Sequence, residues 1–207
     1  MAMLMPNGSV LVVGRETGSN GPPEPTLELL PYGGNVIMLD YLRHTDPNNL
    51  YPFLMVLPSG HFFIGNYLSS TVGAQLLTST CPGYYNEARI LDPVTFNTVT
   101  VLPNMPSTVN NFLAGRTYPL EGSAVLLPQD APYTDPLEIL ICSGSAPFGG
   151  IALDCCISIA PEAANPTWTL ERMVRTCTRI LSSPDDDYVL FKASKRVMPC
   201  MVTLPDG

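Results

Sequence analysis

One short phrase recurs along this chain and limits the folds that it can adopt. The stretches "LMPNGSVLVVG" (4–14) and "VLPSGHFFIG" (56–65) each place a Pro-x-Gly turn between two runs of aliphatic and aromatic residues, and "VTLPDG" (202–207) begins the same phrase. A glycine turn between two β-forming runs predicts a β-hairpin. A longer-looped version pairs "GSAVLLP" with "LEILICSG" within 122–144. The inner runs are almost continuously apolar, which is typical of strands that are buried on both faces.

Each predicted hairpin is followed by a weaker pair of strands. The weaker strands lie in 26–31 and 35–40, in 88–106 and in 156–173. The turn prolines recur at intervals of 52, 70 and 77 residues, at Pro6, Pro58, Pro128 and Pro205. Four strands repeated at about 50 residues, with insertions in some copies, are typical of a kelch-type β-propeller. We therefore predict an all-β, partial propeller over 1–207, with about three blades and half a hairpin of a larger ring; the alternative is a compact four-bladed ring.

The composition supports this fold class and excludes some partners. The chain has 22 prolines, 16 glycines and only 14% charged residues, which favours many short strands with tight turns. Its net charge of -8 disfavours nucleic acid and anionic membranes, because both need basic patches. No apolar run reaches the roughly 18 residues of a membrane span. The start "MAMLMPNG" lacks the basic region of a secretion signal, so we expect an intracellular chain or one whose true beginning lies upstream.

Two odd segments interrupt the repeat, at about 71–87 and 174–194. Each lacks the strand pattern around it and stands where a short turn would suffice. Both segments read in one of two ways. They are either translated, unspliced introns or genuine surface-loop insertions, which loop-closure entropy tolerates.

The cysteines favour disulfides or buried thiols over a metal site, because none shows C-x-x-C spacing. The six are Cys81, Cys142, Cys155, Cys156, Cys177 and Cys200. Adjacent Cys155 and Cys156 would point to opposite faces of a strand. One of them could therefore bridge to Cys142, while the other packs in the core or stays free.

Taken together, the phrases resemble the fungal glyoxal-oxidase-like copper radical oxidases, relatives of galactose oxidase. The phrases that carry the resemblance, in the family's order, are "NGPPEPTLELLP", "TDPNNLYPFLMVLPSGHFFIGN", "ARILDPVTFNTVTVLPNMP", "YPLEGSAVLLP", "ILICSGS", "PTWTLERM" and "KRVMPCMVTLPDG". The resemblance covers nearly the whole chain except the two odd segments. It implies a seven-bladed propeller followed by a β-sandwich, usually secreted, with one copper ion and a tyrosyl radical cross-linked to a cysteine. The implied reaction oxidises aldehydes or primary alcohols with O₂ and releases hydrogen peroxide.

The resemblance assigns no catalytic, cofactor-binding or metal-binding role to any residue of this chain. In the family, the cross-linked tyrosine lies just before the strand that matches "AMLMPNG", and its cysteine partner lies further upstream. The family's second tyrosine and its two histidines follow the point where this chain stops. We therefore expect copper in the parent protein and none in this chain alone.

The histidines and tyrosines of the chain do not replace those ligands. His44 lies in "YLRHTDPNNLYP", which we interpret as a polar loop, and His61 follows a turn glycine. A planar copper site needs both histidines to converge with tyrosines, so surface or packing roles are favoured. Tyr84 and Tyr85 match no family motif.

Other candidate motifs have simpler structural readings. "ICSGSAPFGG" lacks both the following helix and the lysine of a phosphate loop, and neither Ser143 nor Ser145 has the elbow context of a nucleophile. The run Asp185–Asp187 is typical of a solvated turn, and Trp168 of strand packing. Arg15 and Ser143 stand where the family pattern favours glycine, and a positive φ there would cost backbone freedom.

Two function classes follow. The first is an inactive fragment of a copper radical oxidase whose partners are its own missing blades and, in the parent, a small aldehyde or alcohol. The second is a noncatalytic kelch-type module that binds protein or glycan through loops such as "RHTDPNNLYP". Because the final phrase is unfinished, we expect a piece of a longer protein, and the family resemblance implies that this protein is secreted. Because an open arc of blades exposes apolar faces and strand edges, such a piece is expected to be poorly soluble.

Overall fold

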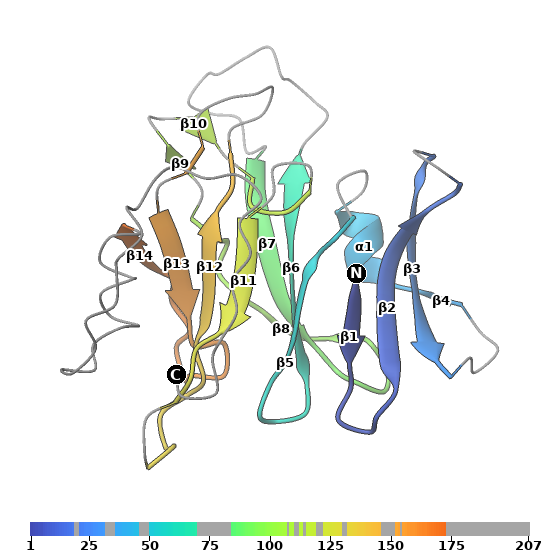
Figure 1. Cartoon of the computed structure of the whole chain (residues 1–207), viewed down its shortest axis with the longest axis horizontal. Helices are drawn as coiled ribbons and strands as arrows, with labels where there is room; N and C mark the ends of the chain where they lie inside the picture. The colour runs from blue at the N-terminus through green and yellow to red at the C-terminus, as the bar shows by residue number, and fades with distance from the viewer. Residues whose placement is uncertain are drawn as a thin grey trace, which may run out of the picture. The chain divides into compact units, whose positions relative to one another are not determined.

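The chain is built almost entirely of antiparallel β-sheets, as a computed structural model shows (Figure 1). The structure describes residues 1–18, 21–31, 36–45, 50–69, 84–106, 108–109, 112–113, 115–118, 122–129, 132–145, 152–153 and 155–172. Three sheets have four strands each, and in each sheet the strands lie in their order along the chain. This arrangement confirms the predicted all-β class and the four-stranded repeat.

The chain divides into two compact units. The first unit spans 1–107 and 117–119, and the second spans 108–116 and 120–207. The first sheet, in the first unit, consists of β1 (Ala2–Leu4), β2 (Val10–Glu16), β3 (Pro23–Leu30) and β4 (Ile37–Met38). The second sheet, also in the first unit, consists of β5 (Phe53–Val56), β6 (Phe62–Ser69), β7 (Tyr84–Leu91) and β8 (Thr98–Val101).

The two Pro-x-Gly turns of the first unit form the same local structure. Met5 N–H donates to the Ser9 carbonyl at 2.8 Å, and Leu57 N–H donates to the His61 carbonyl at 2.8 Å. The turn glycines have φ values of +83° at Gly8 and +87° at Gly60, which only glycine adopts readily. The repeated phrase therefore encodes a repeated hairpin, as predicted.

The backbone at the two positions where glycine was expected differs between the units. In β2 the positive φ of +69° belongs to Gly14, beside a bulge in the pairing with β3, and Arg15 has none. In the second unit Ser143 does have a positive φ, of +65°. Arg15 therefore avoids the expected conformational cost, whereas Ser143 incurs it.

The core of the first unit lies between its two sheets. Leu11, Val13 and Leu27 of the first sheet meet Phe62, Ile64 and Leu91 of the second sheet in one buried cluster. Side chains alternate between the faces of a strand, so Val12, which lies between Leu11 and Val13, points to the opposite face. Each fully buried aliphatic side chain in such a cluster contributes about 1.5–3 kcal/mol.

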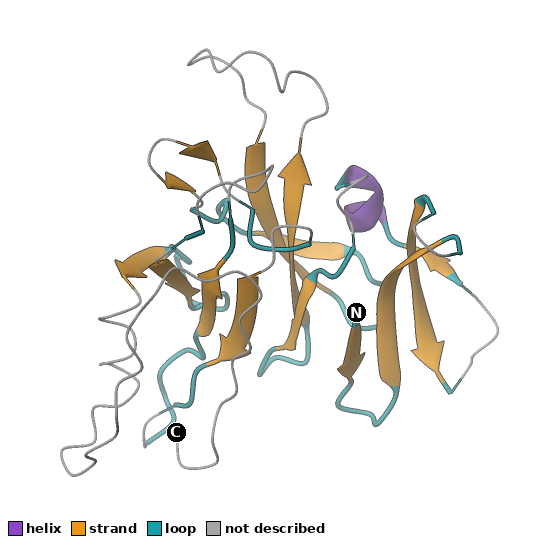
Figure 2. Ribbon diagram, turned by 45° about the horizontal axis from the view of Figure 1, so that its top comes forward, coloured by secondary structure: helices purple, strands orange, loops and turns teal. Residues whose placement is uncertain are grey.

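A short helix replaces the polar loop that we predicted around His44. The helix α1 spans Asp40–His44 and lies at one end of the two sheets (Figures 1 and 2). Tyr41 and Leu42 are buried in the core cluster. The prediction of a loop was wrong over 41–44, because two large side chains of this single turn pack inward, while Arg43 and His44 remain solvent-facing.

The second sheet extends into the first odd segment. Residues Tyr84–Glu87, at the end of 71–87, continue β7 and pair with residues 66–69 of β6. The rest of this segment, the whole of 174–194, Cys81, Cys177, Cys200, the run Asp185–Asp187 and the last phrase lie outside the described residues. The side chains of Tyr84 and Tyr85 lie outside them as well.

The second unit contains the third sheet and a small two-stranded sheet. The small sheet pairs β9 (Thr108–Val109) with β10 (Phe112–Leu113). The third sheet consists of β11 (Gly122–Leu126), β12 (Ile139–Ser143), β13 (Cys155–Ile159) and β14 (Thr169–Arg172). A strand, β13, follows "ICSGSAPFGG" as predicted, so the helix that a phosphate loop requires does not follow it. Among the described residues, no helix is long and apolar enough to cross a bilayer.

A disulfide joins the two central strands of the third sheet. Cys142 of β12 and Cys156 of β13 are direct cross-strand partners and are bonded, and Cys155 is a free, buried thiol. The sequence left open which of the adjacent cysteines bridges to Cys142. The register decides it, because Cys156 and not Cys155 stands opposite Cys142.

We predict that replacing Cys142 with serine destabilises the second unit. The disulfide closes a loop with a sequence separation of 14 residues. Removing it lowers the free energy of unfolding by roughly 3 kcal/mol, mainly because the unfolded chain regains conformational entropy. Urea unfolding followed by the fluorescence of Trp168, the single tryptophan, measures the loss. Cys155→Ser is the control and should keep the crosslink in a non-reducing peptide map; a crosslink of Cys142 to Cys155 would contradict the assignment.

Candidate functional site

The most polar buried place in the first unit surrounds Glu87. We call it the Glu87 cluster, and it consists of Tyr41, His44, Thr45, Asn66, Glu87, Arg89 and Thr117. Its residues come from α1, β6, β7 and the segment after the second sheet. The alternating pattern of β6 and β7 brings Asn66 and Glu87 together, since they are direct partners in the ladder.

Glu87 is a buried carboxylate that contacts the side chains of His44 and Arg89. His44 Nε2 lies 2.9 Å from Glu87 Oε2, and Arg89 Nε donates to Glu87 Oε1. The Glu87 side chain is only 6% exposed, whereas His44 is 48% exposed. A buried carboxylate is tolerated only when it is paired and hydrogen-bonded, so Arg89 and His44 compensate the charge.

Tyr41 ties the helix to the same strand. Its hydroxyl donates to the Glu87 carbonyl at 2.8 Å, and the Arg89 guanidinium lies 5.3 Å from the centre of its ring. Burial, reinforced by the Glu87 carboxylate, raises the pKa of Tyr41 well above its usual value. Tyr41 therefore stays a neutral hydrogen-bond donor near neutral pH.

A chain of neutral hydrogen bonds completes the cluster. Thr117 Oγ1 donates to Asn66 Oδ1 at 2.9 Å, and Asn66 Nδ2 donates to Thr45 Oγ1 at 3.3 Å. Thr45 in turn bonds to carbonyls of α1. All three side chains are buried. The polar atoms of this chain satisfy one another, which is the pattern of a structural network rather than of an open binding site.

The two histidines do not converge on a common metal site. His61 Nδ1 lies 2.8 Å from Ser59 Oγ, and its Nε2 lies 4.0 Å from Asp92 Oδ2, at the far end of β7 from Glu87. The five residue steps from Glu87 to Asp92 span roughly 16 Å of strand, whereas the ligand nitrogens of one metal ion each lie about 2 Å from it.

The described residues do not fit a copper site. They contain no group of three or more His, Cys, Asp or Glu side chains that could hold a metal ion. Tyr41, the tyrosine nearest to His44 in sequence, uses its hydroxyl to bond the Glu87 carbonyl. We derive no chemical step through copper from this chain.

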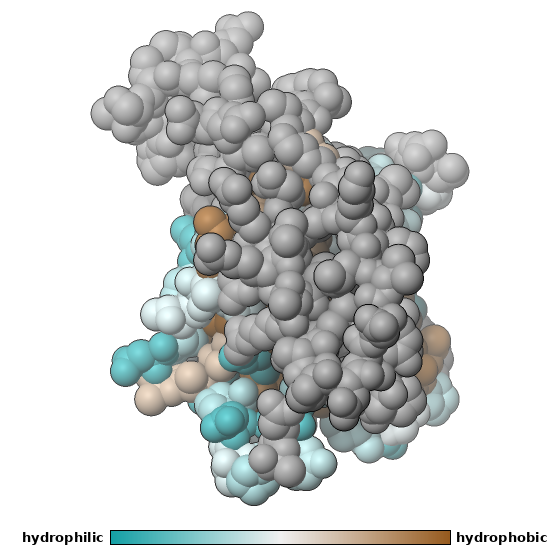
Figure 3. All heavy atoms as spheres, turned by 60° about the vertical axis from the view of Figure 1, so that its left-hand side comes forward, coloured by the Kyte–Doolittle hydropathy of each residue, from teal (hydrophilic) through white to brown (hydrophobic). Residues whose placement is uncertain are grey.

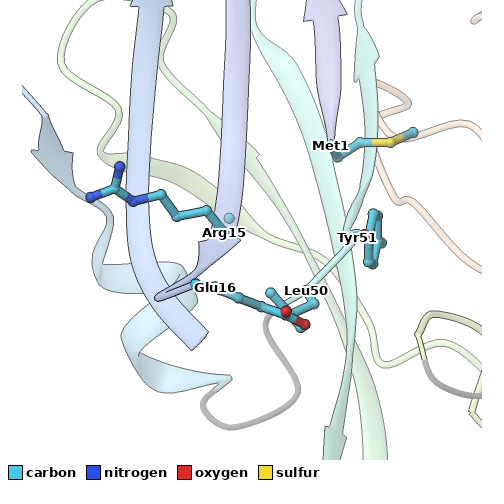
Figure 4. Close-up of a pocket in the computed structure, with 7 residues that line it drawn as sticks. Met1, Arg15, Glu16, Leu50 and Tyr51 are labelled. Atoms are coloured by element: carbon cyan, nitrogen blue, oxygen red, sulfur yellow. The ribbon is translucent and has the colours of Figure 1, made fainter. Parts of the chain in front are cut away.

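A hollow of about 290 Å³ opens beside β2 and β5 (Figure 4). It is lined by Met1, Gly14, Arg15, Glu16, Gly18, Leu50 and Tyr51. The Arg15 side chain points away from Leu50 and Tyr51 and pairs with Glu24 and Glu28 of β3 (Figure 4). Among the residues that line the hollow, Arg15 is the only one with a positively charged side chain, and it forms its ion pairs outside the hollow. The lining residues therefore provide no set of converging polar groups. On the face seen in Figure 3, apolar atoms of the described residues form separate small patches.

The second unit contains a buried arginine that sequence reasoning missed. Arg116 is fully buried, and its Nη1 donates to the Ser143 carbonyl at 2.9 Å and to the Cys155 carbonyl at 3.4 Å. Its Nη2 lies 3.4 Å from Cys155 Sγ. Burial lowers the pKa of Arg116, and the adjacent Cys155 thiol opposes this shift. Arg116 therefore joins the ends of β12 and β13, where Ser143 has its positive φ.

Sequence comparison relates the chain to oxidases and to a much longer fungal protein. A WSC domain-containing protein of Arthroderma benhamiae is 53% identical over 206 residues, which are 100% of this chain and 18% of that protein. Aldehyde oxidase GLOX of Vitis pseudoreticulata is 25% identical over 82% of this chain and 29% of its own length. Aldehyde oxidase GLOX1 of Arabidopsis thaliana is 26% identical over 93% of this chain and 30% of its own length.

These matches cover most of this chain but only a small part of each relative. The chain is similar to plant aldehyde oxidases over most of its length, in both units. No family model matches it. The chain spans less than one third of the length of these three relatives, so what the complete proteins do is a matter for proposal.

We predict that Glu87→Gln destabilises the first unit by about 2 kcal/mol, because the amide loses two charge-assisted contacts in a buried place. Urea unfolding monitored by far-UV circular dichroism measures the change. Glu28→Gln is the matched control, since Glu28 pairs with Arg15 at the surface, where such a pair contributes less than about 1 kcal/mol. Equal losses for the two variants would contradict a special role for the Glu87 cluster.

Proposed function

We propose that this chain is a group of kelch-type propeller blades from a glyoxal-oxidase-like copper radical oxidase. The complete protein would convert an aldehyde, O₂ and water into a carboxylic acid and hydrogen peroxide, or a primary alcohol and O₂ into an aldehyde and hydrogen peroxide. The observation that carries the proposal is the similarity to two plant aldehyde oxidases across 82% and 93% of the chain. The three four-stranded sheets are the unit from which such propellers are built.

The chain alone is proposed to be inactive. Its described histidines are held apart, because His44 lies beside Glu87 in the middle of β7 and His61 lies near Asp92, which directly follows that strand. The copper ligands and the radical tyrosine would come from other parts of the parent protein, together with the remaining blades. The parent is proposed to be secreted, since a disulfide such as Cys142–Cys156 forms and persists in oxidising compartments.

The isolated chain should bind no stoichiometric copper with high affinity and should produce no peroxide. Isothermal titration with Cu²⁺ and a peroxidase-coupled assay with methylglyoxal and with a primary alcohol measure both properties. His44→Ala and His61→Ala should leave the titration unchanged. Tight one-to-one copper binding that either variant abolishes would contradict the proposal.

The longer protein that contains this segment should produce peroxide from an aldehyde or a primary alcohol in a copper-dependent manner. The same assay, run before and after chelation and on the copper-reloaded protein, measures it. Expression with the segment deleted is the control for loss of the scaffold. A folded, copper-loaded longer protein without peroxide production would instead favour the noncatalytic propeller module.

A further inference from the structure

One face of the first sheet carries apolar side chains that are not packed into the core cluster of the described part of the first unit. We call it the open face and define it as Ala2, Leu4, Val10, Val12 and Leu30. These residues alternate with Met3, Leu11, Val13 and Leu29, which pack toward the core cluster, so they point to the other side of the sheet. Leu4 is 67% exposed and Leu30 is 41% exposed.

The internal repeat shows what such a face normally contacts. Aligning the two Pro-x-Gly turns places the row Leu4–Val10–Leu30 of the first sheet on the row Val56–Phe62–Leu91 of the second sheet. Phe62 and Leu91 are fully buried in the core cluster, against the first sheet. The equivalent face of the second sheet is therefore covered by a neighbouring four-stranded sheet.

The next row gives the same result. Ala2 and Val12 of the first sheet correspond to Leu54 and Ile64 of the second sheet, and the third member of each row is charged, Glu28 in the first sheet and Arg89 in the second. Leu54 is 8% exposed and Ile64 is fully buried, whereas Ala2 is exposed and Val12 is only partly buried. The open face thus keeps the apolar character of its counterpart without the cover that its counterpart has.

We propose that the open face docks one further four-stranded antiparallel sheet of the same repeat, supplied by another part of a longer protein. The docking face of that sheet would resemble the one that covers Phe62 and Ile64, which presents Leu11, Val13 and Leu27. The length of the relatives supports this occupant, because this chain spans only 18% to 30% of them. The inference rests on the proposed origin of the chain in a larger propeller.

The far end of the open face limits how the incoming sheet can lie. Arg15 lies beyond the row of Val12 and pairs with Glu24 and with Glu28, which stands opposite Val12, and the Arg15 side chain is half exposed. An exposed ion pair resists burial under an apolar sheet. The incoming sheet therefore contacts the end near the Pro6–Gly8 turn, and the ion-paired end stays hydrated.

Three lysine variants test the proposal in two settings. Val10→Lys alters the open face, Leu11→Lys alters the buried face of the same strand, and Val94→Lys alters a side chain that is 81% exposed. The settings are this chain by itself and a chimera in which it replaces the matching segment of the Arthroderma benhamiae relative. Folding is measured by soluble yield, far-UV circular dichroism and resistance to protease.

The effect of V10K should differ between the two settings. In the isolated chain we expect V10K to fold like V94K, with a lower binding of the dye ANS than the unaltered chain. In the chimera we expect V10K to behave like L11K and to lower the soluble, folded yield by at least about tenfold, because a lysine ammonium would be buried without a partner.

Three results would overturn the proposal. The first is V10K unfolding the isolated chain as L11K does, and the second is a folded chimera that is insensitive to V10K. The third is a discrete dimer of the isolated chain that V10K dissociates while the chimera is unaffected, which would make a second copy the occupant. If the unaltered chimera is insoluble, the ANS comparison in the isolated chain decides. Loss of peroxide production with an intact response to V10K would refute the oxidase and leave the docking face standing.

Discussion

Face-to-face burial of β-sheets is the constraint on which the structure of the first unit depends. A four-stranded antiparallel sheet has two faces, and each face that carries large aliphatic residues needs a cover. The first and second sheets cover one another through Leu11, Val13, Phe62 and Ile64. The helix α1 closes one end of this interface with Tyr41 and Leu42.

Buried charge is the main cost that accompanies this packing, and each unit meets it differently. In the first unit Glu87 is compensated by His44 and Arg89, two charged or chargeable side chains. In the second unit Arg116 is held largely by main-chain carbonyls and by the sulfur of Cys155. Arg116 thus adds hydrogen bonds to carbonyls at the ends of β12 and β13.

The sequence predicted the strands well because their pattern is local. A Pro-x-Gly turn with β-forming residues on both sides determines a hairpin within about a dozen residues, and the hairpins around Gly8 and Gly60 agree with it. The prediction failed at α1, where burial of Tyr41 and Leu42 by distant strands outweighs the polar residues of the same segment. It also missed Arg116 and the Glu87 cluster, because their partners are far apart in sequence.

The sequence allowed an expectation about copper ligands, but it did not predict how the side chains of the candidate site are arranged. The sequence does not show that His44 lies beside Glu87 and His61 near Asp92. The distance between the two histidines depends on the register of β6 and β7. Strand register also determines which of Cys155 and Cys156 forms the disulfide with Cys142. A shift of one residue in the pairing of β12 with β13 would have exchanged them.

In each sheet, neighbouring strands follow one another along the chain. The connections between them differ in how well they tolerate added residues. The Pro-x-Gly turns leave no room for extra residues without breaking their paired hydrogen bonds. The connection from β6 to β7, in contrast, joins two strands that already pair over eight residues, and a longer connection there costs little more than slowly rising closure entropy. Evolution can therefore vary one rim of the second sheet while the opposite rim stays fixed, and new recognition loops would accumulate on the variable rim.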